Sequence, residues 1–413
     1  MKPRVLIVDP SLRSAAGHHL GVVNAVRRVL KKLNVDNVSL VSLFAPPDFC
    51  RDENLVPIFE KSIYFREAWT RAEFDEGAHK FCADLRAAIR RRHLRPDMLI
   101  LPAADQVVVA GLALYLQRYR PREGPEILIW IAMEPHFKKP VDDPSVGPLL
   151  EEYRGAFAAL RAAVTDKGRL HVCCEMQAMS RLYEPFAGLK VETVTVDRME
   201  QQPRGPRVRH PGEPINVVCV GNANTAKGYF LLPDTIEQLN RQRDDLRFLI
   251  HGTVEQTDDP ESWQTLQRVA ALGSNVTVRT DVLSPEGYLA WLTQADLVLL
   301  PYDPHRYKTC MSGIFNEAVK LGIPSVATGD CDFPRQAISE RRAVGIEGHD
   351  AESVASAVLA AADRLEEISV NAANFAARQG ADNKLESLLG DAVQAMDNQP
   401  ESFAGKARRW LGL

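Results

Sequence analysis

Hydrophobic positions along the chain fall into two alternating patterns. Short apolar runs that fit buried strands occur at residues 4–9, 38–44, 98–101, 127–133, 170–174, 191–196, 216–220, 246–252, 276–282, 297–300 and 324–327. Between them, apolar residues recur at helical spacing, at 22–33, 66–94, 107–119, 176–186, 288–295, 314–321, 351–365 and from 372 onward. Buried strands that alternate with helices predict an α/β fold with parallel, doubly wound sheets.

A proline-rich segment divides this pattern into two series. Residues 198–214 contain prolines at 203, 206, 211 and 214, so this segment cannot form a regular element and is typical of a linker. A chain of 413 residues is also too long for a typical single core. We therefore predict an N-terminal domain over 1–197, a linker over 198–214, a C-terminal domain over 215–390 and a tail over 391–413, which crosses back to the first domain in the family described below.

Composition narrows the function classes. The apolar content of 45% and charged content of 25% are those of an ordinary globular protein. A net charge of -4 gives no basic footprint and argues against nucleic acid as a partner. The seven cysteines form no CxxC pair, which favours reduced thiols over disulfides or a zinc site. The sequence shows no signal peptide and no apolar run of about 18 residues, so we expect a cytoplasmic protein.

The stretch from residue 297 to 328 has the order strand, loop, helix, strand. Ser312 is suited to cap the helix, and Gly313 lets a ligand approach free backbone N–H groups at Gly313 and Ile314. A helix N-terminus of this kind is a site for an anion such as a diphosphate. Glu317, about one turn further, could accept hydrogen bonds from two ribose hydroxyls. The alternative is that Glu317 only complements the helix dipole.

Other polar residues follow predicted strands, where doubly wound folds bind ligands. The loop after the first strand contains Gly17, His18 and His19, but it is not GxGxxG and predicts no dinucleotide site. Glu134 and His136 follow the strand at 127–133. For each of these histidines, a simple loop residue is the alternative.

The run Asn-Glu-Ala-Val-Lys-Leu-Gly-Ile-Pro-Ser-Val-Ala-Thr at 316–328 resembles the donor-site signature of retaining GT-B glycosyltransferases of the family-four type. The loop at 221–228 is similar to the family's Gly-Arg-x-x-x-x-Lys-Gly, with Lys227 and Gly228 matching. The resemblance implies two Rossmann-like domains facing a cleft. Two positions depart from it: Asn222 replaces an arginine, and Thr309 replaces a glutamate that faces the donor sugar.

The resemblance also implies roles for the site residues. Lys227 and the amides at Ser312, Gly313 and Ile314 would hold the donor diphosphate, and Glu317 the ribose. Glu134 and His136 would lie at the reacting sugar. Gly17, His18, His19 and Thr309 would contact the donor sugar or the acceptor. Arg306 or Lys308 could replace the charge that is missing at Asn222. Asp330 and Asp332 have the spacing of a metal site, but they fall in a different architecture, so no metal or cofactor is expected.

The function that follows is transfer of a sugar, with retention, from a nucleotide-sugar donor to a glycan or lipid-linked acceptor in polysaccharide or glycolipid assembly. The basic residues at 90–93 beside apolar residues could dock on an anionic membrane surface and give a peripheral contact at its inner face; the alternative is a solvated charged surface. Two other functions stay open. Asn222 and Thr309 favour a catalytically idle nucleotide-binding or scaffold protein. A nucleotide-sugar epimerase would need an acid and base pair.

Overall fold

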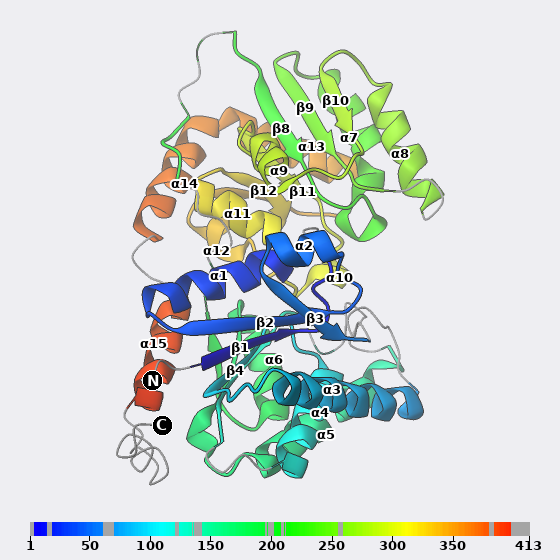
Figure 1. Ribbon diagram of the computed structural model, residues 1–413. Helices are drawn as coiled ribbons and strands as arrows, with labels where there is room; N and C mark the ends of the chain where they lie inside the picture. Colours follow the sequence, from blue (N-terminus) through cyan, green and yellow to red (C-terminus); the bar gives the residue numbers. More distant parts are fainter. Residues whose placement is uncertain are drawn as a thin grey trace.

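The predicted apolar runs form two parallel sheets, one in each half of the chain (Figure 1). The computed structural model describes residues 4–14, 19–60, 70–119, 124–133, 135, 143–194, 196, 202–207, 210, 212–254, 259–379 and 384–397. Helices cover both faces of each sheet (Figure 1). The predicted α/β architecture of two doubly wound, Rossmann-like domains is therefore confirmed.

The N-terminal sheet has seven strands in the order β3-β2-β1-β4-β5-β6-β7, and every pair is parallel. Its strands are β1 Arg4–Asp9, β2 Asp36–Ser42, β3 Leu55–Phe59, β4 Met98–Leu101, β5 Glu126–Ile131, β6 Leu170–Cys174 and β7 Val191–Thr193. Its helices are α1 His19–Lys32, α2 Pro47–Asp52, α3 Arg71–Arg91, α4 Gln106–Tyr119, α5 Val146–Ala163 and α6 Gln177–Ala187. Strand order changes direction beside β1, as in other doubly wound folds.

The C-terminal sheet has six parallel strands in the order β10-β9-β8-β11-β12-β13. Its strands are β8 Ile215–Cys219, β9 Leu246–His251, β10 Val276–Arg279, β11 Leu297–Leu300, β12 Ser325–Thr328 and β13 Ala343–Ile346. Its helices are α7 Leu232–Asn240, α8 Pro260–Ala270, α9 Pro285–Leu292, α10 Pro304–Tyr307, α11 Gly313–Leu321, α12 Arg335–Ser339, α13 Ala351–Asp363 and α14 Leu365–Gln379.

The structure adds elements that the apolar pattern did not predict. β3 contains Pro57, which lacks a backbone N–H and is tolerated because β3 is an edge strand. Strand β13, at one edge of the C-terminal sheet, was not predicted either. The sequence pattern predicted no helix between three pairs of consecutive strands, and the structure has helices α5, α7 and α8 there. Helix α9 begins at Pro285, three residues before the predicted start, because Ser284 caps it by accepting a 3.1 Å hydrogen bond from Gly287 N.

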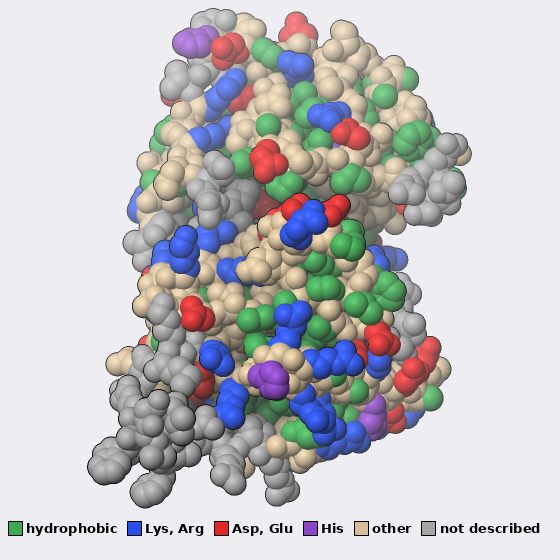
Figure 2. Space-filling model, in the orientation of Figure 1, with side chains coloured by type: hydrophobic (Ala, Val, Ile, Leu, Met, Phe, Trp, Pro, Cys, Tyr) green, Lys and Arg blue, Asp and Glu red, His purple; other side chains and the backbone are tan. Residues whose placement is uncertain are grey.

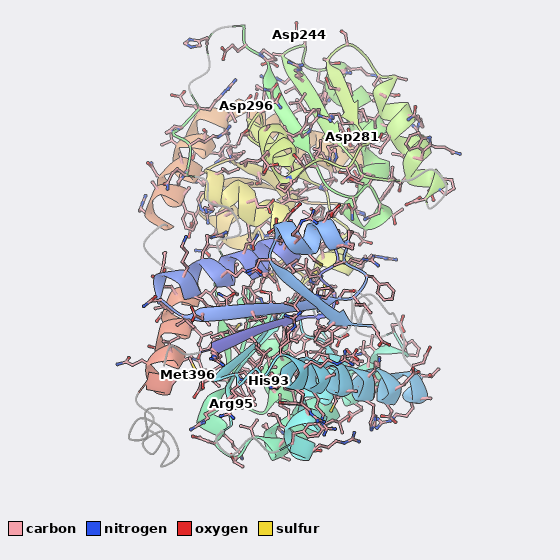
Figure 3. The ribbon with its side chains drawn as sticks, in the orientation of Figure 1. His93, Arg95, Asp244, Asp281, Asp296 and Met396 are labelled. Carbon is pink, nitrogen blue, oxygen red and sulfur yellow. The ribbon has the colours of Figure 1, made fainter. Side chains whose placement is uncertain are left out.

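Residues 202–207 form no helix or strand and are held against the C-terminal domain. The Arg207 guanidinium pairs with Asp296 at 2.7 Å, and the Asp296 side chain is fully buried. The second oxygen of Asp296 accepts a 2.9 Å hydrogen bond from Asn216 N at the second residue of β8. Figure 3 shows Asp296 on the side of the sheet where this segment passes. One buried carboxylate thus joins this segment to the first strand of the second sheet.

The last described helix, α15 Lys384–Asp397, lies against the N-terminal domain rather than the C-terminal one (Figure 1). Leu385 and Leu389 are buried in the same apolar cluster as Val23 and Val26 of α1. At the surface, Lys32 Nζ and Glu386 Oε2 lie 2.7 Å apart. The chain therefore crosses between the domains twice.

None of the helices in the described part of the chain combines the length and apolarity needed to cross a bilayer. The basic residues at 90–93 are exposed around the end of α3, and Figure 3 shows His93 on the N-terminal domain, away from the C-terminal one. On the face shown in Figure 2, acidic and basic side chains are interspersed over both domains.

Substituting Gly228 by Ala is expected to destabilise the protein strongly. Gly228 has a φ of +70°, and a β-carbon there would lie 1.9 Å from the carbonyl oxygen of Pro301. Backbone strain and overlap together predict a loss of about 2 to 4 kcal/mol in the free energy of unfolding, measured by urea denaturation.

The matched control for Gly228→Ala is Gly155→Ala on α5. Gly155 is exposed in a helix interior, and a β-carbon there would meet no atom within 4 Å. Alanine should stabilise this helix by about 0.5 to 1 kcal/mol. Similar stability changes in the two variants would contradict the close packing of Gly228 on Pro301.

Candidate functional site

Helix α11 presents its N-terminus to the region between the domains. Ser312 is the N-cap, as predicted: its Oγ accepts a 3.2 Å hydrogen bond from Phe315 N. The first N–H groups of a helix have no partners within the helix, and the aligned peptide dipoles make this end positive. Gly313 and Ile314 are partly exposed there. The N-terminus of α11 therefore has the properties of an anion site.

Aromatic side chains fix the loop that leads into α11. Tyr302 packs against Tyr307 with ring centroids 4.5 Å apart, and Phe333 packs against Phe315 of α11 at 5.1 Å. The Tyr302 hydroxyl lies 3.4 Å from Ser312 Oγ. Burial raises the pKa of Tyr302 well above its ordinary value, so this hydroxyl stays neutral. These contacts hold the anion site rigidly before any ligand arrives.

Lys227 lies beside the start of α11. A β-carbon at Gly221 would lie 2.6 Å from Lys227 Nζ and 3.0 Å from Ile314 Cδ1, so these three groups converge. The turn that carries Lys227 is capped by Asn224, whose Oδ1 accepts a 3.0 Å hydrogen bond from Lys227 N. A lysine and a helix N-terminus, predicted separately from two stretches of sequence, thus meet in space.

Glu317 lies on the same face of α11 as Ile314, because residues three apart are neighbours on a helix. Its Oε2 accepts a short hydrogen bond from the hydroxyl of Tyr288 on α9. No motif in the sequence pointed to Tyr288, which comes from a separate helix. Tyr288 orients the carboxylate that we expect to contact a ribose.

The neighbouring loop after β9 lies against the loop that carries Lys227. Asn222 and Thr253 form a parallel bridge, and Thr253 N donates to Gly221 O at 3.0 Å. His251 is buried, and its Nε2 lies 2.9 Å from the carbonyl oxygen of Asp281. Burial lowers the pKa of His251, so this imidazole is neutral near pH 7. Nε2 then carries the hydrogen and donates a hydrogen bond to the backbone carbonyl oxygen of Asp281.

Two residues that could replace the missing arginine charge, Arg306 and Lys308, lie on α10 and directly after it. Asn222 is exposed. Arg306 is exposed on α10 with its Nε 3.9 Å from Asp303 Oδ2, and Lys308 is also exposed. Thr309 is different, because its Oγ1 is buried and forms no hydrogen bond within the described part of the chain.

The aspartates at 330 and 332 have other contacts. Asp332 pairs with Arg335 at 2.7 Å. In the residues that the structure describes, no group of three His, Cys, Asp or Glu side chains is arranged to hold a metal ion.

A hollow of about 760 Å³ lies beside β13 and includes Asp330 and the exposed Arg341 and Arg364. Both arginines pair with Glu367, at 3.3 and 3.1 Å.

Of the predicted N-terminal site residues, only His19 lies in the described part of the chain. Gly17, His18, Glu134 and His136 fall outside it. His19 is the first residue of α1 and is buried, and its Nδ1 donates to Asp9 Oδ2 at 2.9 Å. Asp9, the last residue of β1, also accepts a 3.1 Å hydrogen bond from Leu12 N. A buried carboxylate therefore fixes the orientation of the imidazole.

A second carboxylate at this edge reaches the C-terminal domain. Glu175 directly follows β6, and its Oε2 accepts a 3.4 Å hydrogen bond from Asn316 Nδ2 on α11. Buried apolar residues from both domains also form one contiguous cluster. Glu175 was not predicted as a site residue, although a polar residue just after an apolar strand is a usable signal.

Asp105 is a third carboxyl group in the N-terminal domain and lies just before α4. Its Oδ1 accepts a 2.9 Å hydrogen bond from Val108 N. Burial raises its pKa from 3.8 to about 7, and the charge of Glu152 acts in the same direction. Burial outweighs the hydrogen bonds, which favour the ionised form.

Comparison with known protein families finds a match in the second half of the chain. Residues 214–364 match the family described as Glycosyl transferases group 1. This range includes Lys227, Ser312 and Glu317, so it supports the resemblance drawn from those stretches. No curated protein sequence matches the chain.

Solved structures are similar over nearly the whole chain. A glycosyltransferase from Rickettsia africae has a TM-score of 0.66 at 11% identity, covering 97% of this chain and 100% of that one. Sucrose-phosphate synthase from Thermosynechococcus elongatus has a TM-score of 0.65 at 13% identity, covering 96% and 99%. Anabaena HepE, in complex with UDP and glucose, has a TM-score of 0.62 at 11% identity, covering 96% and 99%. The fold of this protein is GT-B.

Asp105 is expected to make stability depend on pH. Its folded pKa of about 7 lies above the ordinary 3.8, so the folded state holds this proton more tightly. The free energy of unfolding should therefore fall as pH rises from about 4 to about 7, by up to about 1.4 kcal/mol per pH unit.

Asp105→Asn removes this titration and keeps a residue suited to cap α4. The free energy of unfolding of each protein is measured by urea denaturation at a series of pH values. The value for the variant minus the value for the wild type should increase from pH 5 to pH 7 and become constant above pH 7. A difference that does not change with pH would contradict the assignment. Glu152, whose pKa burial also raises, is present in both proteins, and its charge is one of the causes that raise the pKa of Asp105.

Proposed function

We propose that this protein is a retaining glycosyltransferase that moves a sugar from a nucleotide-sugar donor to an acceptor hydroxyl. One observation carries the proposal: Lys227 converges with the N-terminus of α11 at Gly221 and Ile314. Both elements lie in the range that matches Glycosyl transferases group 1. A similar fold, that of HepE, was solved with UDP and glucose, which supports a nucleotide-sugar donor.

The C-terminal domain, proposed as residues 215–390, would bind the nucleotide. The Lys227 ammonium and the amides of Gly313 and Ile314 would contact the diphosphate, because a cation and a helix N-terminus both favour negative charge. Ser312 holds that helix start in place. Glu317, oriented by Tyr288, would accept hydrogen bonds from the ribose hydroxyls.

In the transfer step, the bond between the anomeric carbon and the donor phosphate oxygen breaks, and a bond from that carbon to the acceptor oxygen forms. Negative charge grows on the departing diphosphate. Lys227 and the α11 dipole would stabilise that charge without a metal ion. With retention, attack and departure occur on the same face of the sugar, so the acceptor hydroxyl can pass its proton to the departing diphosphate.

The N-terminal domain, proposed as residues 1–197, would bind the acceptor, a glycan or a lipid-linked sugar. His19, held by Asp9, would contact the donor sugar or the acceptor, together with Gly17 and His18. We assign Glu134 and His136 to the reacting sugar. The exposed basic residues at 90–93 would bring the enzyme to the inner face of a membrane that carries such acceptors.

A catalytically idle nucleotide-binding or scaffold protein is the second candidate. Two observations favour it. Asn222 puts an exposed neutral side chain where the resembled family has a cation, and Thr309 puts a hydroxyl where that family has a carboxylate. Such a protein would bind a nucleotide, or only a partner, and would not turn over a donor.

Lys227→Ala is expected to abolish most nucleotide binding. Wild-type protein should show a higher melting temperature with one of UDP, GDP, ADP or TDP, with or without magnesium, because a ligand that binds only the folded state stabilises it. Loss of a charge-assisted contact should weaken that affinity by about tenfold to a hundredfold.

The control for Lys227→Ala is Lys190→Ala, which removes an exposed lysine that pairs with Glu192. It should leave the thermal shift unchanged. A wild-type protein that binds none of the four diphosphates at millimolar concentration would overturn the donor site. A shift that needs magnesium would overturn metal independence.

Glu317→Ala should separate a transferase from an idle protein. The variant should remain folded but lose about tenfold to a hundredfold in kcat/KM for release of nucleoside diphosphate from the nucleotide sugar, because the ribose hydroxyls lose a charged partner. Glu261→Ala, on the exposed first turn of α8, is the control and should keep full turnover. Wild-type protein that binds the nucleotide but releases no diphosphate, with any acceptor tried, would favour the idle protein.

A further inference from the structure

We infer that Glu175, from the N-terminal domain, recognises the sugar of the donor by accepting hydrogen bonds from its hydroxyl groups. The inference rests on the proposed function and assigns a specificity-determining residue within it. It also supplies the carboxylate that Thr309 lacks, and it supplies it from the opposite domain.

Glu175 approaches one particular face of α11. Ile314 and Glu317 share the face that meets Lys227 and Tyr288. Asn316 lies about 100° around the helix from Glu317, because an α-helix has 3.6 residues per turn. Glu175 contacts Asn316 and therefore approaches α11 on the flank next to Glu317, about 160° around the helix from Ile314.

Along the helix axis, the contact with Glu175 lies near the N-terminus of α11. The Asn316 amide also lies 3.0 Å from Met311 Sδ, so it reaches back to the residue that precedes the Ser312 cap. Glu175 meets the amide there, close to the helix N-terminus. A diphosphate bound at that terminus would carry its sugar outward from α11. The opposing domain is then the surface that the sugar meets.

The negative charge of Glu175 limits which part of the donor it can bind. A carboxylate accepts hydrogen bonds and repels phosphate, so Glu175 suits hydroxyl groups rather than the diphosphate. The Asn316 amide is one of the donors that satisfy it in the absence of a sugar. Sugar hydroxyls would take over this role. Thr309 Oγ1, buried without a hydrogen bond among the described residues, cannot replace a carboxylate in this role.

The experiment compares a nucleoside diphosphate with its nucleotide sugars. UDP, GDP, ADP and TDP identify the base, and the sugars of that base, such as UDP-glucose, UDP-galactose and UDP-N-acetylglucosamine, or GDP-mannose, are then titrated by calorimetry. The readout is the ratio of Kd for the bare diphosphate to Kd for the preferred nucleotide sugar. Glu175→Gln should reduce this ratio about tenfold and leave the Kd of the bare diphosphate unchanged.

Two further variants separate sugar recognition from a contact that only joins the domains. Asn316→Ala removes the interdomain hydrogen bond but keeps the carboxylate, and it should leave the ratio within about twofold of wild type. Glu151→Gln changes an exposed carboxylate on α5 and should also leave the ratio unchanged.

Each outcome decides between the hypotheses. An unchanged ratio in Glu175→Gln overturns the role of Glu175 alone, as does an equal loss of affinity for diphosphate and nucleotide sugar. A matching loss in Asn316→Ala assigns the effect to domain contact and also overturns it. Wild-type protein that binds no diphosphate defeats the proposed function itself, and this inference with it.

Discussion

Every strand pair in both sheets is parallel, and this constraint determines where the protein can place its chemistry. Parallel neighbours require a crossover helix, so all loops that follow strands gather at one edge of each sheet. The loop after β8 brings Lys227 to the start of α11, which follows β11, the neighbouring strand. In the other sheet, Asp9 is the last residue of β1 and Glu175 directly follows β6, at the same edge. The parallel strand order therefore brings the residues of the candidate site together, and their side chains then determine its chemistry.

The positive N-terminus of α11 is fixed in place by the contacts around it. The Ser312 cap, the packed aromatic rings around Tyr302 and the close packing of Gly228 on Pro301 each fix one end of the loops that meet there. These contacts form in the absence of a ligand, so a bound anion would not have to order the loops itself. Charge stabilisation by fixed dipoles is most effective when the dipoles need not reorient.

Local sequence predicted the parts of the fold and site that local contacts create. The Ser312 cap and the Lys227 turn each depend on residues within a few positions, and both stretches could be interpreted in isolation. Tyr288 could not, since its partner Glu317 lies 29 positions away. Glu175 carries a local signal because it follows a strand, but its partner Asn316, 141 positions away, is not readable from the sequence. The edge strand β3 was missed for a different reason: Pro57 is disfavoured in central strands, and only the sheet order shows that this strand is at an edge.

The two domains carry complementary chemistry, and this division fits a substrate with two unlike ends. The C-terminal edge offers an ammonium group and a helix N-terminus, which suit phosphate. The N-terminal edge offers the carboxylates of Asp9 and Glu175, which suit hydroxyl groups and imidazole. A nucleotide sugar presents a diphosphate followed by a ring of hydroxyls. Because Glu175 lies on the opposite domain from the phosphate-binding groups, the sugar would be recognised fully only when the domains come together, so that recognition and closure would be one event.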